Sequence, residues 1–138
     1  MNKHHILKDY GGAPLILNLP VAAAHNENYR QALWTGDHLQ LTVMTIPQGG
    51  EIGAEMHDTL DQMLRVESGV ALVRIGEEAG RLRDARRIGA GSVFLIPAGV
   101  YHNVLNVGRE PLRLSSVYAP PAHPKGTVHK TRDEQIEA

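Results

Sequence analysis

Side chains able to bind a metal gather at two places in the middle of the chain. Glu55 and His57 stand two residues apart, and Gln62 follows five residues after His57. The fourth of these side chains, His102, comes from a separate segment, forty residues after Gln62. Imidazole nitrogens combined with carboxylate and amide oxygens form a ligand set for divalent transition ions. Cysteine is absent from the chain, so thiolate-bound zinc and iron–sulfur clusters are excluded.

Short predicted strands would bring these side chains together. Glu55 and His57 share one face of a strand, because side chains alternate between the two faces of extended backbone. Gln62 begins the next strand, and His102 shares a face with Val104 in a later one. The three strands are predicted at residues 54–57, 62–66 and 101–106. Three such segments can aim two imidazoles, a carboxylate and an amide oxygen at one point.

Short apolar segments separated by turn residues extend through most of the chain. Further strands are predicted at 15–19, 30–35, 39–46, 70–75, 92–96 and 112–118. In 39–46 one face is apolar and the other semi-polar, which favours burial on one side. Turns are frequent, with 14 glycines and 8 prolines. This pattern predicts an all-β sandwich or barrel, and without a repeat or composition break we expect one domain over 1–138.

Several segments outside the strands carry weaker signals. Residues 21–28 favour a short helix, and the tail 119–138 is expected to form a surface loop with a frayed or short helical end. The arginines of 81–87 are interpreted as a solvated hairpin tip, although a phosphate or carboxylate site is the alternative. His123 and His129 could line a dimer contact or the barrel mouth. His4 and His5 are expected to be disordered.

The residues around His102 resemble a family motif. Gly91 is followed by five residues, then Pro97, one residue and Gly99, and then by two residues, His102, three residues and Asn106. This spacing is the complete second motif of the cupins, G-x5-P-x-G-x2-H-x3-N.

The segment 49–69 resembles the first cupin motif, G-x5-H-x-H-x(3,4)-E-x6-G. Its glycines and His57 agree, whereas Glu55 replaces the first histidine and Gln62 replaces the glutamate. These replacements keep one negative charge at the site. Asp61 is the rival of Gln62, because a three-residue gap is allowed, but Asp61 would point to the opposite face.

The resemblance implies a single-domain cupin with an RmlC-like jelly-roll barrel and short helical or irregular termini. It further implies one divalent transition metal (Mn, Fe, Ni, Co or Zn) held by Glu55, His57, Gln62 and His102, and a homodimer. Cupins include isomerases, dioxygenases, decarboxylases and non-catalytic binding proteins, so the fold does not choose the reaction.

The first functional hypothesis is a metal-dependent, isomerase-like enzyme for a small polar substrate that is sugar-like or an oxo-acid. An Fe(II)-type dioxygenase is the next candidate, because two histidines and one carboxylate form a known Fe(II) ligand set. A non-catalytic small-molecule-binding cupin is the alternative from another class. No general base is identified; Glu55 would be the first candidate if it did not bind metal.

Charge and hydropathy limit the partners. The formal net charge is −1, which gives no strong attraction to nucleic acid or to an anionic membrane surface. No apolar run approaches the ~20 residues that a membrane span needs. The polar N-terminal residues have no signal-peptide pattern, so we expect a cytoplasmic protein.

Overall fold

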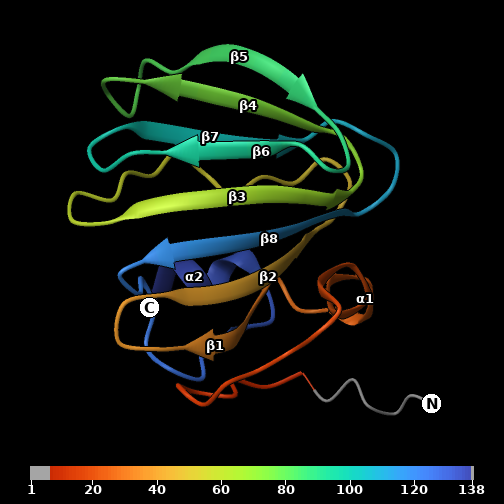
Figure 1. The fold of residues 1–138 in the computed structure, drawn as a ribbon. Helices are drawn as coiled ribbons and strands as arrows, with labels where there is room; N and C mark the ends of the chain where they lie inside the picture. Colours follow the sequence, from red (N-terminus) through yellow and green to blue (C-terminus); the bar gives the residue numbers. More distant parts are fainter. Residues whose placement is uncertain (1–6, 138) are drawn as a thin grey trace.

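The computed structural model describes residues 7–137, so the expectation for His4 and His5 lies outside the described residues. The chain forms two antiparallel sheets (Figure 1). In spatial order, the larger contains β6 (Val93–Ile96), β3 (Asp61–Ser68), β8 (Leu112–Ala119), β2 (Gln40–Ile46), β1 (Arg30–Thr35) and β9 (Val128–His129). The smaller contains β5 (Arg83–Ile88), β4 (Ala71–Gly76) and β7 (Tyr101–Asn106). The all-β jelly-roll prediction is confirmed.

Two of the predicted strands are absent. Residues 15–18 are irregular, and Leu19 begins α1 (Leu19–His25) because Asn18 caps the helix and Pro20 occupies its first turn. The helix predicted at 21–28 is therefore present but starts earlier. Residues 54–57 form only an isolated bridge, between Glu55 and His102. The other predicted strands are present with ends shifted by at most a few residues.

Most of the arginine-rich segment is a strand and not the predicted hairpin tip, although Arg81 lies in the connection between β4 (Ala71–Gly76) and β5. β5 lies at the edge of the smaller sheet, and its residues are exposed or nearly so. An edge strand tolerates charge on both faces, because water solvates side chains that a central strand would bury. Across the β4–β5 pair, Arg74 Nε donates to Asp84 Oδ1 at 2.6 Å.

The tail contains one element that the sequence pattern did not indicate. The two-residue strand β9 pairs with β1, opposite Arg30 and Gln31. The expected helical end is α2 (Arg132–Glu137). No helix among residues 7–137 is long and apolar enough to cross a membrane.

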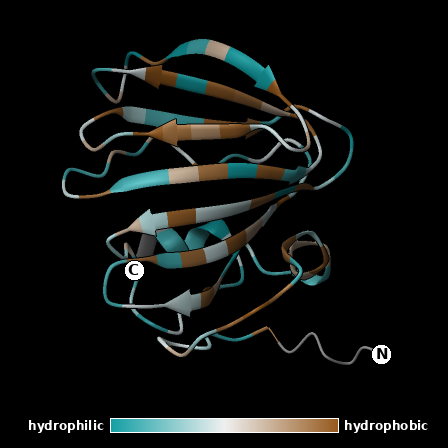
Figure 2. Ribbon diagram, in the orientation of Figure 1, coloured by the Kyte–Doolittle hydropathy of each residue, from teal (hydrophilic) through white to brown (hydrophobic). Residues whose placement is uncertain are grey.

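The space between the sheets is divided into an apolar half and a polar half. Along β8 the interior residues change from Leu112 and Leu114 to Ser116 and Tyr118, all of them buried. β2 changes at the same level, because Thr42 pairs with Ser116, and β3 changes one residue pair further on, because Leu64 pairs with Ser116 and Gln62 with Tyr118. Figure 2 shows the alternation of apolar and polar residues along β3. The apolar half holds the main core, and the polar half contains the candidate site.

The prediction for 39–46 put the burial on the apolar face, but the semi-polar face of β2 is the more buried one, whereas Leu41 and Thr45 on the apolar face are half-buried. Val43, on the apolar face, packs with Ala22 and Ala23 of α1 in a second small core. The semi-polar face, with Gln40 and Thr42, lines the interior of the barrel.

Candidate metal centre

Glu55, His57 and His102 form a compact cluster of ligand atoms, called here the ligand cluster. One ligand atom from each residue lies within 4.8 Å of the other two. Glu55 Oε1 is 3.3 Å from His102 Nε2 and 3.6 Å from His57 Nε2. Ligand atoms about 2.1 Å from one metal ion stand ~3–4 Å apart. The cluster therefore fits one divalent ion.

The backbone positions Glu55 against β7 even though the segment is irregular. The amide of Glu55 donates to the carbonyl of His102 at 2.9 Å, and the reverse bond is also 2.9 Å. Just before this bridge, Gly53 has φ +100° and donates its amide to Asn103 Oδ1 at 2.8 Å. A left-handed backbone at this point favours glycine and turns the chain into the bridge.

The two histidines are anchored by backbone carbonyls. His102 is fully buried, and its Nδ1 lies 3.1 Å from the Val100 carbonyl. A proton on Nδ1 serves that bond, which leaves the Nε2 lone pair available for a metal. For His57 the anchor is its own carbonyl, which accepts from the Gly99 amide at 2.8 Å. His57 Nε2 is buried, 3.6 Å from Glu55 Oε1, and has no hydrogen-bond partner among residues 7–137, so its lone pair is available for a metal.

Glu55 is held in its ionised form. Burial alone would raise the pKa of the carboxyl, but the contacts with His102 and His57 outweigh it and lower the pKa to about 2. The carboxylate is thus charged at neutral pH and ready to bind a cation. The side chains of Glu55 and His57 remain 23% and 21% exposed, so the cluster can be reached from solvent.

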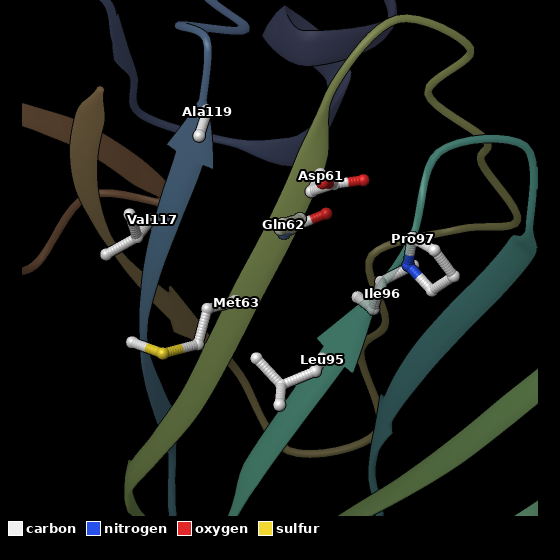
Figure 3. Close-up of a pocket in the computed structure, with 8 residues that line it drawn as sticks. All are labelled: Asp61, Gln62, Met63, Leu95, Ile96, Pro97, Val117 and Ala119. Carbon is white, nitrogen blue, oxygen red and sulfur yellow. The ribbon is translucent and has the colours of Figure 1, made fainter. Parts of the chain in front are cut away.

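Gln62 and Asp61 lie on opposite faces of β3. Gln62 is buried; its Nε2 donates to Ser116 Oγ at 3.3 Å, while Oε1 has no partner. Asp61 is exposed and accepts the Ala98 amide at 3.0 Å. Figure 3 shows both residues beside the outer pocket that Met63 and Leu95 line. Asp61 is not part of the ligand cluster, and Gln62 stays the predicted fourth ligand.

A row of aromatic rings leads from the ligand cluster to a second group of histidines. Tyr118 stands edge-on to His57 at 5.8 Å and to His123 at 5.2 Å, between ring centroids. His129 follows His123 at 6.1 Å, and Arg30 Nη1 lies 3.2 Å from His129 Nδ1. Tyr118 and Arg30 were not singled out from the sequence, and the position of His123 and His129 was left open.

Comparison with known protein families identifies the family of this chain. The family model described as "Cupin domain" matches residues 42–118, more than half of the chain. The chain belongs to the cupin family. That match includes both motifs and every residue of the ligand cluster.

Relatives of this cupin cover nearly its whole length. The uncharacterized protein YrkC of Bacillus subtilis strain 168 is 43% identical over 137 residues, which is 99% of this chain and 74% of YrkC. The crystal structure of BH2720 from Bacillus halodurans has a TM-score of 0.92 at 46% identity, covering 95% of this chain and 99% of that one. An oxalate decarboxylase structure has a TM-score of 0.56 at 22% identity, covering 64% of this chain and 23% of that one, and shows the fold alone.

Substitutions in β3 test the fourth ligand of this cupin. Gln62→Glu is expected to tighten divalent-ion binding about tenfold or more, because a carboxylate binds a divalent cation more strongly than an amide oxygen. Gln62→Ala should weaken it. Titration of the metal-free protein with Mn²⁺ or Zn²⁺ measures both changes. Asp61→Asn is the matched control. If this variant weakens divalent-ion binding and Gln62→Ala does not, the fourth ligand is Asp61 and not Gln62.

His123 makes the stability of this cupin depend on pH. Burial, the Arg30 charge and His129 lower the pKa of His123 from 6.5 to about 3, while Glu55 opposes the shift and His57 adds to it. Below pH 6.5 the unfolded chain binds the proton first, so stability falls as the pH drops towards 3. The free energy of unfolding of the wild type should fall between pH 7 and pH 5, and His123→Asn should reduce this fall by about 1–2 kcal/mol.

Urea denaturation of metal-free protein at both pH values measures this effect. The exposed His38 provides the control, His38→Asn, which should keep the wild-type pH dependence. If His123→Asn loses as much unfolding free energy between pH 7 and pH 5 as the wild type does, the prediction is contradicted.

Proposed function

We propose that this cupin is a metal-dependent enzyme acting on a small polar substrate, with one divalent ion held by Glu55, His57, Gln62 and His102. The observation that carries the proposal is the convergence of three ligand atoms within 4.8 Å. Mn, Fe, Co, Ni and Zn all suit two nitrogen and two oxygen ligands. Two features of the chain support a fit: the partnerless Nε2 of His57 and the partnerless Oε1 of Gln62.

An isomerase-like reaction at a carbon next to a carbonyl is the form we favour. A bound ion would supply Lewis-acid polarisation of the substrate oxygen, with about two open positions in an octahedral shell. Tyr118 lies against His57. Burial raises the pKa of its hydroxyl and outweighs the opposing charge of Arg30, and the Glu55 charge adds to the rise, so the phenol keeps its proton. A phenol in this state can donate a hydrogen bond to developing oxyanion charge.

An Fe(II) dioxygenase is the second candidate. The observation in its favour is the composition of the ligand cluster, two histidines and one carboxylate, which is the ligand type of non-haem Fe(II) oxygenases. Under this candidate, Glu55, His57 and His102 would hold the ion, and Gln62 would orient Ser116 or the substrate.

Elemental analysis of untagged protein, purified without chelator or added metal, tests the proposal. Near one equivalent of a transition metal is expected; Fe would favour oxygen chemistry, whereas Zn or Mn would favour isomerisation. No metal after reconstitution with Mn²⁺, Fe²⁺, Ni²⁺ and Zn²⁺ would overturn it in favour of a non-catalytic binding cupin.

We further propose that the protein is a homodimer through the outer face of the larger sheet. On β6, Val93 is 45% and Leu95 is 70% exposed, beside Met63 and Val117. Apolar side chains gathered on one outer face are typical of an interface between protomers.

Leu95→Arg tests this interface. We expect the variant to elute as a monomer in size-exclusion chromatography with light scattering, because a charge at the centre of an apolar contact is poorly solvated. The exposed His38→Arg variant adds charge elsewhere and should remain dimeric. A monomeric wild-type protein would refute the proposal.

A further inference from the structure

Arg30 carries a buried positive charge. Its side chain is 1% exposed, on the interior face of β1 opposite Met44. Nη1 contacts His129 Nδ1 at 3.2 Å and donates to Gln135 Oε1 at 2.5 Å; Nη2 contacts the Met44 sulfur at 3.7 Å, and Nε has no partner. Among residues 7–135, no carboxylate lies within ion-pair distance of this guanidinium. Buried charges are normally paired, so this cation requires an explanation.

His123 lies on the row of rings between Arg30 and the ligand cluster, and one of its ring nitrogens has no hydrogen-bond partner among the described residues. Its Nε2 is buried without a hydrogen bond. The backbone of His123 is fixed by Gln40, whose Oε1 accepts the amide of His123 at 2.9 Å and whose Nε2 donates to its carbonyl at 2.8 Å. A fully buried glutamine thus holds the loop that carries this imidazole.

These groups share one electrostatic environment with the metal ligands. Arg30, Glu55 and His57 all act on the charge state of His123, and Arg30 and Glu55 both act on Tyr118. With a divalent ion beside the single Glu55 carboxylate and Arg30 opposite, the polar half of the interior carries excess positive charge. An anionic ligand would compensate it, because opposite charge is strongly favoured where water is excluded.

We propose that Arg30 and His123 form a subsite for the carboxylate of a small hydroxy or oxo acid, whose other oxygen faces the ligand cluster. His123 is the half-buried contact residue and donates a ring N–H to the carboxylate. Arg30 is the positioning residue behind it and supplies the positive charge. The excess of positive charge and the ligand's orientation towards the cluster rest on the proposed function. The buried guanidinium of Arg30, which has no carboxylate partner among residues 7–135, and the half-buried ring of His123 do not.

The arginines around the β4–β5 hairpin are a poorer anion site. Arg81, in the connection before β5, is 83% exposed on its side chain and pairs with Glu78, and Arg74 of β4 pairs with Asp84 of β5. Exposed, paired charges attract a small anion weakly. The contrast favours the interior, where the charge has no anionic partner among the described residues.

Calorimetric titration of the full chain with glycolate and with its neutral analogue glycolamide tests the subsite. Wild-type protein, metal-loaded and metal-free, is compared with Arg30→Met and His123→Phe. We expect each variant to bind glycolate about ten- to a hundredfold more weakly, with glycolamide binding unchanged. His123→Phe keeps an aromatic ring against Tyr118, so weaker glycolate binding by this variant reflects the missing N–H donor and not a change in packing. Arg74→Met removes the same charge from the outer side of β4, where the side chain is 39% exposed, and should bind glycolate as the wild type does.

The outcomes separate this inference from the proposed function. Glycolate affinity that Arg30→Met and His123→Phe leave unchanged would overturn the subsite, even if one metal ion is bound. Equal loss of glycolate and glycolamide binding would also overturn it, because that result indicates a general structural change. Arg30-dependent glycolate binding by a protein that takes up no metal would sustain the subsite while refuting the metalloenzyme. Thermal unfolding of each variant verifies that it is folded.

Discussion

His102→Ala is expected to leave the purified protein without stoichiometric metal and to lower its stability by several kcal/mol. The imidazole is fully buried and lies 3.3 Å from the Glu55 carboxylate, so its removal takes away one of the three ligand atoms of the ligand cluster. A metal that binds only the native state stabilises it by about 2.7 kcal/mol at a hundred times its dissociation constant. Truncation also leaves a cavity and removes the bond to the Val100 carbonyl, adding about 1–3 kcal/mol.

The two contributions can be separated with a chelator. Thermal unfolding of wild-type protein should shift downward on adding EDTA, whereas His102→Ala should unfold at the same temperature with and without it. The exposed His38→Ala variant should behave as the wild type does. Full metal content in His102→Ala would show that His102 is not a metal ligand.

Glu55→Gln is expected to weaken divalent-ion binding about a hundredfold or more, while the fold is kept. The substitution keeps the shape of the side chain but removes the only carboxylate of the ligand cluster. A charged ligand next to a divalent cation contributes several kcal/mol in a partly desolvated site. Since the pKa of Glu55 is about 2, the wild-type ligand is fully ionised at neutral pH and the whole charge is lost.

Competition against a metal-sensitive dye, at fixed pH and ionic strength, measures this loss. The exposed Glu27→Gln variant carries the same change of net charge and should keep wild-type affinity. Combining Glu55→Gln with Gln62→Glu should restore part of the affinity, because the carboxylate returns to the cluster from a neighbouring strand. Wild-type affinity in Glu55→Gln would mean that the two imidazoles alone hold the ion.

The candidate site was predictable where side-chain spacing alone determines it. His102 was assigned to the interior of a strand by the motif around it, and it lies there on β7. Glu55 and His57 were assigned to a strand that does not form. Their side chains still converge, because paired backbone hydrogen bonds fix Glu55 against His102 from an irregular segment. An isolated bridge of this kind produces no repeating pattern of residue types that could be recognised in the sequence.

Arg30 shows what spacing cannot predict. An arginine at the start of a strand normally lies in solvent, and nothing near it in the sequence indicates otherwise. Its burial depends on His129 and Gln135, about a hundred residues away, which the short strand β9 and helix α2 bring against β1. β9 itself has only two residues, too few for an alternation to be recognised.

The division of the interior into two halves has a consequence for how this protein can change. β2, β3 and β8 each carry apolar residues for the core at one end and polar residues for the site at the other. The change comes at Thr42 and Ser116, and one residue pair further on, at Gln62, in β3. Residues that keep the chain folded are therefore largely distinct from those that contact a ligand. Exchanges in the polar half, such as glutamate for histidine at position 55, can alter ion preference or chemistry while the apolar half maintains the scaffold. Selection can thus explore new reactions on this barrel without first having to rescue its stability.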